Sequence, residues 1–162
     1  MKINIRLEKP KDYRKVEEIT RAAFNTPDRI KNSQIDCPME HHMVHRLREK
    51  DGIMDLSFVA EMDGEIVGHI IYSNAHILQS NGSKVAVLNF GPISVLPEMQ
   101  KMSIGSLLMR YSIKEAKKLG YGAILFFGHP EYYPRFGFVP AEKFNITDCN
   151  GDNYPSFIGH GA

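Results

Sequence analysis

The stretch from Val85 to Phe127, VAVLNFGPISVLPEMQKMSIGSLLMRYSIKEAKKLGYGAILFF, decides the fold. It opens with an apolar run, 85–95, that predicts a strand. Apolar residues then recur three and four positions apart over 104–111, which predicts an amphipathic helix that ends at Leu119-Gly120. The continuous apolar run 123–127 is typical of a strand covered on both faces. Strand, helix and strand together predict a crossover that joins a parallel pair.

Upstream of this stretch, the spacing of the apolar residues changes from that of a strand to that of a helix. Residues 3–7 alternate as a strand does, and residues 9–24 have helical spacing after Pro10. A second helix is predicted over 39–49, with Met39, Met43, Val44 and Leu47 as its apolar stripe.

Two turn signals then connect three predicted strands. Asp63-Gly64 separates 56–60 from 66–77, and Asn81-Gly82-Ser83 leads into 85–95. We therefore expect one α/β domain over 1–162, in which an antiparallel meander feeds one parallel pair and helices cover both faces of a mixed sheet.

Composition excludes several classes of protein. The chain has 162 residues, 43% of them hydrophobic and 24% charged, which excludes disordered and fibrous classes. With 20 basic and 19 acidic residues the net charge is +1. The electrostatic field of the whole protein therefore does not favour nucleic acid or membrane as a partner. No apolar run approaches the ~20 residues of a membrane span. Cys37 and Cys149 form no paired motif, and we expect a cytoplasmic protein.

Gly91-Pro92 is out of place in the predicted strand 85–95. Proline donates no ladder hydrogen bond and glycine weakens a strand interior, so we expect a bulge or splay there. The main-chain groups of Ile93, Ser94 and Val95 would then need other partners. An extended ligand with its own amides would supply them.

The segment that follows predicts an anion site. The first amides of a helix are unpaired and favour negative charge, and a basic side chain lies beside them. The residues concerned are Gln100, Lys101, Met102, Ser103, Ile104, Gly105 and Ser106. Taken alone, the segment is equally compatible with a capped helix start. Next to the predicted splay it suits a cofactor with a pantetheine arm and a diphosphate.

Two motifs carry a family resemblance. Gln100-Lys101-Met102-Ser103-Ile104-Gly105 resembles the Q/R-x-x-G-x-G/A loop of the GNAT superfamily of N-acetyltransferases. The segment 130–138, PEYYPRFGF, resembles the tyrosine-bearing turn of its YhbS-like members. The resemblance runs from about residue 3 to 140. It departs from the pattern at Ser103, where the family has a glycine, and in the glycine-rich tail, where we expect a final strand that is short or missing.

The resemblance implies an N-acetyltransferase that uses acetyl-CoA as cosubstrate and no metal. An acceptor's primary amine, on a small molecule or a protein, would attack the thioester directly, with main-chain amides near 93–95 facing the oxyanion. Tyr133 would protonate the departing thiolate; the alternative is a tyrosine that only packs at an edge. Glu61, His69 and Glu40 are the candidate bases, acting through water. A homodimer is common in the family.

Two rival functions remain open. One is a non-catalytic CoA-binding or interaction module on the same fold, which would bind CoA without catalysing a reaction. The other is a metal site on Cys37, His41 and His45, whose spacing could align ligands on one helix face. Pro38 argues against a helix through Cys37, and no fourth ligand is evident.

Overall fold

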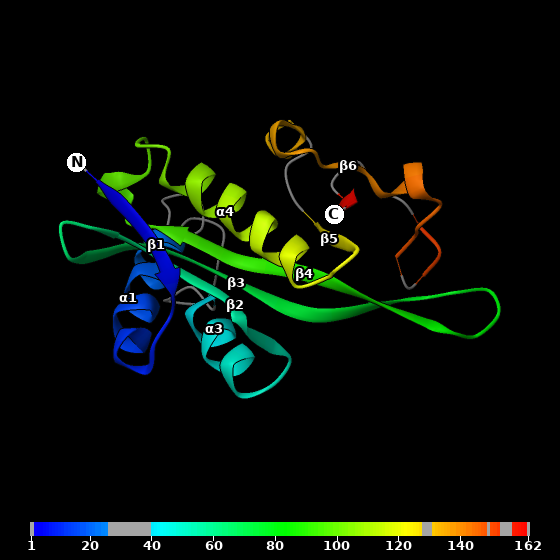
Figure 1. The fold of residues 1–162 in the computed structure, drawn as a ribbon, viewed down its shortest axis with the longest axis horizontal. Helices are drawn as coiled ribbons and strands as arrows, with labels where there is room; N and C mark the ends of the chain where they lie inside the picture. Colours follow the sequence, from blue (N-terminus) through cyan, green and yellow to red (C-terminus); the bar gives the residue numbers. More distant parts are fainter. Residues whose placement is uncertain (1, 26–39, 128–130, 149, 153–156, 162) are drawn as a thin grey trace. The chain divides into compact units, whose positions relative to one another are not determined.

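The computed structural model describes residues 2–25, 40–127, 131–148, 150–152 and 157–161 (Figure 1). The helices and strands are β1 (Ile3–Leu7), α1 (Tyr13–Phe24), α3 (Glu40–Glu49), β2 (Gly52–Met62), β3 (Glu65–Leu78), β4 (Lys84–Val95), α4 (Ile104–Lys118), β5 (Ala123–Phe127), β6 (Val139–Pro140) and β7 (Phe157–Gly161). The elements predicted from sequence are present, with ends that differ by a few residues. β2 begins at Gly52 rather than near Leu56, and α1 begins at Tyr13, after a 3₁₀ turn over Pro10–Asp12.

The strands form one mixed sheet in the order β1-β2-β3-β4-β5-β7-β6. β4 and β5 pair in parallel at Leu88↔Ile124, and β1 pairs antiparallel with β2 from Ile3↔Met62 to Leu7↔Phe58. This confirms the predicted fold class, a meander joined to one parallel pair. The chain divides into two units, residues 1–73 with 91–112 and residues 74–90 with 113–162, and each is described by itself.

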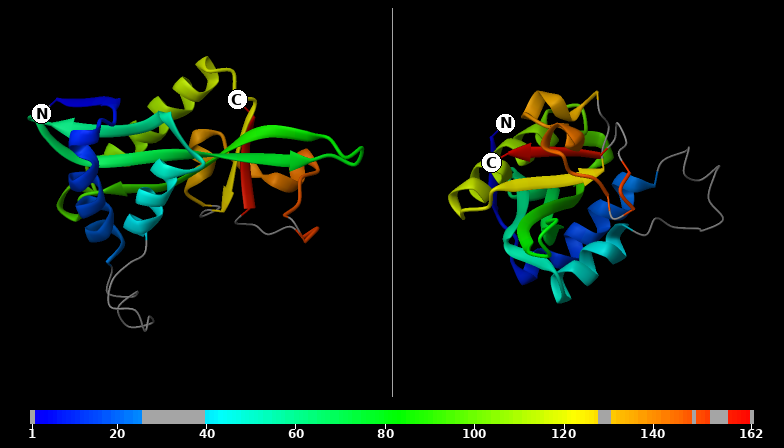
Figure 2. Two further views of the ribbon diagram at one scale, coloured as in Figure 1. Left: turned by 90° about the horizontal axis from the view of Figure 1, so that it is seen from below. Right: turned by 90° about the vertical axis from the view of Figure 1, so that its right-hand side faces the viewer.

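In the first unit, helices cover both faces of the strands. α1 and α3 lie side by side on one face (Figure 2), where Val16, Ile19 and Val44 pack with Val59 and Ile66. Phe58, the neighbour of Val59 in β2, points to the opposite face and contacts the ring of Tyr111 on α4, with ring centroids 5.2 Å apart. Successive strand residues point to opposite faces, so alternate side chains of β2 pack against the α1–α3 side and against α4.

In the second unit, β5 packs a small core with the β3–β4 hairpin. Val87, Leu125 and Ala141 are buried together, with Ala75 and Ile77 against them. The hairpin turn is closed by Gln79, whose N–H donates to the Ser83 carbonyl over 2.8 Å. The tail forms the five-residue strand β7, which pairs with β5 from Ala123↔Gly161 to Phe127↔Phe157 and with β6.

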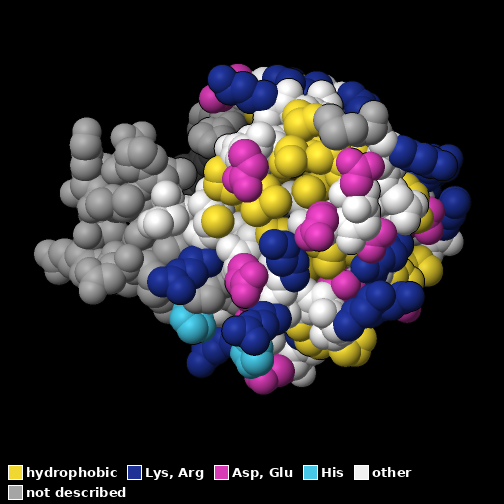
Figure 3. Space-filling view, turned by 90° about the vertical axis from the view of Figure 1, so that its left-hand side faces the viewer, with side chains coloured by type: hydrophobic (Ala, Val, Ile, Leu, Met, Phe, Trp, Pro, Cys, Tyr) yellow, Lys and Arg dark blue, Asp and Glu magenta, His cyan; other side chains and the backbone are white. Residues whose placement is uncertain are grey.

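Charge is distributed evenly on the face drawn in Figure 3, where basic and acidic side chains alternate around an apolar area. This fits the near-neutral net charge of +1. None of the helices in the described ranges is both long and apolar enough to cross a bilayer.

Candidate active site

β4 continues through Gly91-Pro92 to Val95, and its backbone is irregular at Gly91. Gly91 adopts φ +118°, a conformation that a side chain would strain. The parallel register of β4 with β5, Leu88↔Ile124, lies before this point, and Leu96, just after β4, still donates its N–H to the Val67 carbonyl (2.9 Å).

Among the residues proposed to bind the cofactor arm, Ser94 differs from its neighbours. Its side chain is buried and lies 3.1 Å from the Thr20 hydroxyl. Because Thr20 donates its own proton to the Val16 carbonyl (2.8 Å), the Ser94 hydroxyl is the donor in this pair. The hydroxyl is therefore committed to α1, and only the backbone of Ser94 remains for a ligand. The side chains of Ile93 and Val95 are half-buried.

The predicted anion segment is a 3₁₀ turn, Pro97–Met99, followed by a turn and the start of α4. Gln100 Nε2 donates to the Val95 carbonyl over 3.2 Å, which ties the turn to the end of β4. The Leu107 N–H donates to the Ser103 carbonyl (3.1 Å), so the amides of Ser103, Ile104, Gly105 and Ser106 precede this bond. Such amides have no partner within the helix and suit an anion.

The side chains of this segment divide between core and surface. Ile104 is fully buried and anchors the helix, whereas Lys101, Met102 and Ser103 are exposed. Ser103 adopts φ +62°, in the left-handed region. This is the position where the family pattern has glycine, and the backbone supplies the physical reason for that glycine. Gly105 approaches Val95, whose Cγ2 would lie 3.9 Å from an added Cβ.

Tyr133 belongs to the second unit, in the 3₁₀ turn Tyr133–Phe136. Its ring packs edge-on against Phe126, at 4.7 Å between centroids, and against Tyr132 at 5.0 Å. Burial raises the pKa of its hydroxyl above the ordinary 10, so the phenol stays protonated at neutral pH. Such a group can donate a proton but cannot serve as a base. Arg135, two residues on, stacks on the Tyr132 ring and donates its Nε–H to the Tyr132 carbonyl (2.8 Å).

The three candidate bases lie in different surroundings. His69 is completely buried, with Nε2 3.0 Å from the Ser57 hydroxyl and 3.4 Å from Glu8. Burial lowers the pKa of His69, outweighing Glu8, which acts to raise it. Glu61 accepts the Nε–H of Arg6 over 2.7 Å. Glu40 is half-buried at the first residue of α3. His69 and Glu61 are thus engaged in structural contacts.

The metal hypothesis is only partly covered by the structure. Cys37 lies outside the described residues, and so does the other cysteine, Cys149. His45 has Nδ1 3.5 Å from Glu17 and Nε2 3.2 Å from Glu49. Within the described ranges no group of three or more metal-ligating side chains gathers.

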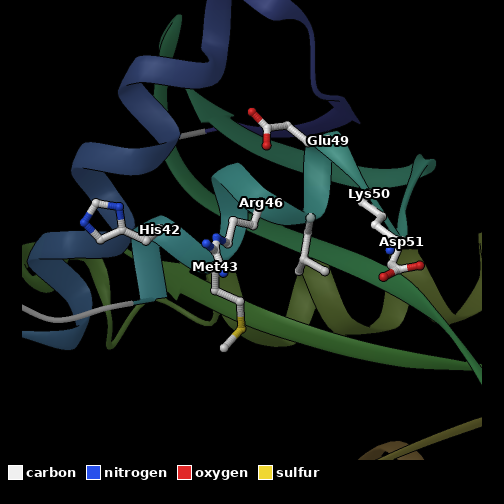
Figure 4. Close-up of a pocket in the computed structure, with 7 residues that line it drawn as sticks. His42, Met43, Arg46, Glu49, Lys50 and Asp51 are labelled. Carbon is white, nitrogen blue, oxygen red and sulfur yellow. The ribbon is translucent and has the colours of Figure 1, made fainter.

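A hollow of about 890 Å³ lies beside α3 and the turn into β2, within residues 42–51 (Figure 4). Met43 and Leu47 on this side of α3 were predicted as part of an apolar stripe, whereas the basic residues beside them were given no role. The signal of the hollow in the sequence is this pair of basic residues, Arg46 and Lys50, four positions apart beside Met43 and Leu47.

Comparisons with known proteins place the chain in a family. Residues 14–138 match the model of the acetyltransferase (GNAT) family. The uncharacterized N-acetyltransferase YjhQ of Escherichia coli K12 is 34% identical over 102 residues, which are 62% of this chain and 51% of YjhQ. The match thus spans about half the length of that relative. The uncharacterized N-acetyltransferase YhbS of the same strain is 27% identical over 143 residues, 88% of this chain and 77% of YhbS.

Two solved structures share the fold. A GNAT family acetyltransferase from Brucella melitensis, in complex with acetyl-CoA, is 32% identical, with a TM-score of 0.70 over 85% of this chain and 83% of that one. YhbS from Escherichia coli, in complex with CoA, is 22% identical, with a TM-score of 0.77 over 99% of this chain and 82% of that one. The predicted fold and family are therefore confirmed, and the chain belongs to the acetyltransferase (GNAT) family.

Proposed function

We propose that the chain transfers an acetyl group from acetyl-CoA to a primary amine, on a small molecule or on a protein. The observation that carries this proposal is the segment 100–106, where unpaired helix-start amides and the exposed Lys101 stand next to the end of β4. The family match supports the cosubstrate, since the Brucella relative is in complex with acetyl-CoA and YhbS with CoA.

In this proposal the segment 100–106 binds the diphosphate and the main chain of 93–95 binds the pantetheine arm. The side chain of Ser94 takes no part, because its hydroxyl bonds Thr20. The amine nitrogen forms a bond to the thioester carbon, the carbon–sulfur bond breaks, and the sulfur leaves with the electron pair. Main-chain amides near 93–95 stabilise the oxyanion.

Two protons move in this reaction. The Tyr133 hydroxyl gives its proton to the departing sulfur, a role supported by the raised pKa of that hydroxyl. The proton lost by the amine passes to water. His69 is a poor base for it, because the ring is buried and its Nε2 already contacts Ser57.

The test has two readouts on the purified protein. Coenzyme A should raise the melting temperature in a concentration-dependent way, because a ligand that binds only the folded state stabilises it. Acetyl-CoA with a panel of amines should then release free thiol, faster with at least one amine than with none. A melting shift without thiol release for any amine would contradict catalysis and favour a CoA-binding module. No melting shift at millimolar CoA would contradict the cofactor site itself.

A further inference from the structure

The hollow beside α3 has two kinds of wall. Met43 and Leu47 are one turn apart and form an apolar row, and Arg46 and Lys50 form a basic row next to it. Met43 is 51% exposed although it belongs to the apolar stripe predicted from sequence, whereas Val44 of the same stripe is fully buried. At about 890 Å³ the hollow lies within the usual size range of small-molecule sites.

Two cations, Arg46 and Lys50, and two carboxylates, those of Glu49 and Asp51, line the hollow. The Glu49 carboxylate is 3.2 Å from His45 Nε2 and points to the other side of α3 from Met43 (Figure 4). Asp51 is engaged by a further interaction of its own. The side chains of Arg46 and Lys50 make no hydrogen bond or ion pair with the rest of the described chain.

α3, which carries Met43, Arg46 and Leu47 and ends just before Lys50, is fixed from its inner side. Val44 packs into the core with Val16 and Val59. Arg48 donates to Glu8 at 2.7 Å and to Glu17 at 3.1 Å, and its guanidinium lies 4.1 Å from the centre of the Tyr13 ring. A surface held in place in this way loses little conformational entropy when a ligand binds.

We propose that this hollow binds a small amphiphilic anion, a carboxylate or a phosphate monoester joined to an apolar chain. Arg46 and Lys50 hold the anionic group, and Met43 and Leu47 contact the chain. The proposal goes beyond the acetyl transfer proposed above and does not depend on it. Carboxylate and phosphate monoester share the chemistry that these two side chains recognise.

The first experiment measures binding by isothermal titration calorimetry, without acetyl-CoA, of octanoate, octyl phosphate and octylammonium below their micellar concentrations. We expect at least one of the two anions to bind with a Kd of about 1 mM or tighter, and octylammonium at least 10-fold more weakly. The tighter anion identifies the headgroup. Equal binding of octylammonium, or no heat from either anion at 5 mM, would overturn the proposal.

A matched pair of double variants tests the basic row. Arg46→Gln with Lys50→Gln should weaken anion binding at least 10-fold. Arg14→Gln with Arg21→Gln removes two exposed cations from α1 and should leave the affinity within 2-fold. All four positions are exposed, so both variants should keep the wild-type melting temperature. Equal affinities in the two double variants would contradict the assigned role of Arg46 and Lys50.

A chain-length series tests the apolar row. In the wild type, octanoate should bind at least 5-fold more tightly than butanoate, because each buried methylene adds affinity. In Met43→Ser this ratio should fall below about half of its wild-type value, while butanoate binds as before. An unchanged ratio would show that the chain lies elsewhere. Thiol release from acetyl-CoA is measured separately, so failure here leaves the proposed acetyl transfer standing.

Discussion

Arg48 on α3 and Glu8, at the end of β1, form a bidentate ion pair, with Nε 3.1 Å from Oε1 and Nη2 2.7 Å from Oε2. The Glu8 side chain has no exposed surface and that of Arg48 only 6%. Ser57 donates its hydroxyl to the same carboxylate at 3.0 Å, and its oxygen lies 3.0 Å from His69 Nε2. This arrangement places the imidazole proton on Nε2. Nδ1 then has no partner within the described chain.

The first prediction concerns this pair. Arg48→Met keeps most of the side-chain volume but leaves the Glu8 carboxylate buried without its cation. Removing one partner of a buried ion pair costs about 3 to 5 kcal/mol of unfolding free energy. Urea denaturation should show this loss, whereas Arg14→Met, at a side chain that is 94% exposed, should change stability by less than about 0.5 kcal/mol. Equal stability of the two variants would mean that the pair contributes nothing.

The second prediction is a loss of stability on acidification. Burial acts to raise the pKa of Glu8, but hydrogen bonds from His69 and Arg48 outweigh it and bring the pKa to about 2 from 4.5. The unfolded chain therefore binds this proton first as the pH falls, and the contribution of Glu8, about 3 kcal/mol, is lost between about pH 4.5 and 2. His69 adds a loss that begins below pH 6.5, because burial lowers its pKa.

Two variants separate these contributions in denaturant titrations at each pH. His69→Gln should remove the loss of unfolding free energy just below pH 6.5 and leave the loss between about pH 4.5 and 2 in place. Glu8→Gln should be less stable at pH 7, because Arg48 loses its bidentate partner and, within the described chain, keeps only the ion pair with Glu17. The same variant should lose the steep fall in unfolding free energy below pH 4.5. If the wild type is as stable at pH 3.5 as at pH 7, the assignment to Glu8 is wrong.

Sequence patterns were sufficient to predict those helices and strands whose neighbouring residues share one environment. The crossover of β4, α4 and β5 follows from local periodicity, because one face of α4 is apolar and β5 is an unbroken apolar run. The segment 100–106 was predicted in the same way, as a helix start with a basic residue, and α4 begins there at Ile104. The tail was harder to predict, since the glycine-rich end gives little strand signal and yet β7 pairs with β5 from Ala123↔Gly161 onward.

Contacts between distant residues could not be read from the pattern. Glu8, Arg48, Ser57 and His69 meet only because the register of β1, β2 and β3 and the docking of α3 bring them together. His69 could therefore be named only as one of three candidate bases, although the fold buries it completely. Ser94 is a similar case. Its position in β4 was predicted, but the direction of its hydroxyl depends on Thr20 of α1.

The third prediction is a stabilising substitution at Ser103. Its φ of +62° costs a residue with a Cβ about 1 kcal/mol, a strain that glycine does not have. Ser103→Gly should therefore raise the unfolding free energy by up to about 1 kcal/mol, and Ser103→Val should lower it. Ser106→Gly, in the first turn of α4, is the control and should lower stability by about 0.5 to 1 kcal/mol. A loss of stability in Ser103→Gly would show that the Ser103 side chain contributes more than its strain costs.

The fourth prediction concerns Gly137, which ends the turn that carries Tyr133. Gly137 adopts φ +96°, and a Cβ there would lie 2.7 Å from Nε2 of His160. Gly137→Ala should therefore cost about 1 to 3 kcal/mol, because a Cβ strains the backbone at this φ and the His160 ring must shift to make room. Gly122→Ala is the control, since a Cβ at that position meets nothing within 4 Å. Thermal unfolding compares the two, and an equal melting temperature would contradict the close packing of Gly137 on His160.

The fifth prediction tests the proton donor. Tyr133→Phe keeps the ring that packs against Phe126, so the melting temperature should stay within about 2 °C of wild type. Loss of the donated proton should lower kcat about 100-fold and leave the KM for acetyl-CoA nearly unchanged, because the hydroxyl acts in the transition state. Tyr132→Phe is the matched control and should keep at least half of the wild-type kcat. Should thiol release show instead a raised KM with unchanged kcat, Tyr133 would be a residue that packs against the cofactor and donates no proton.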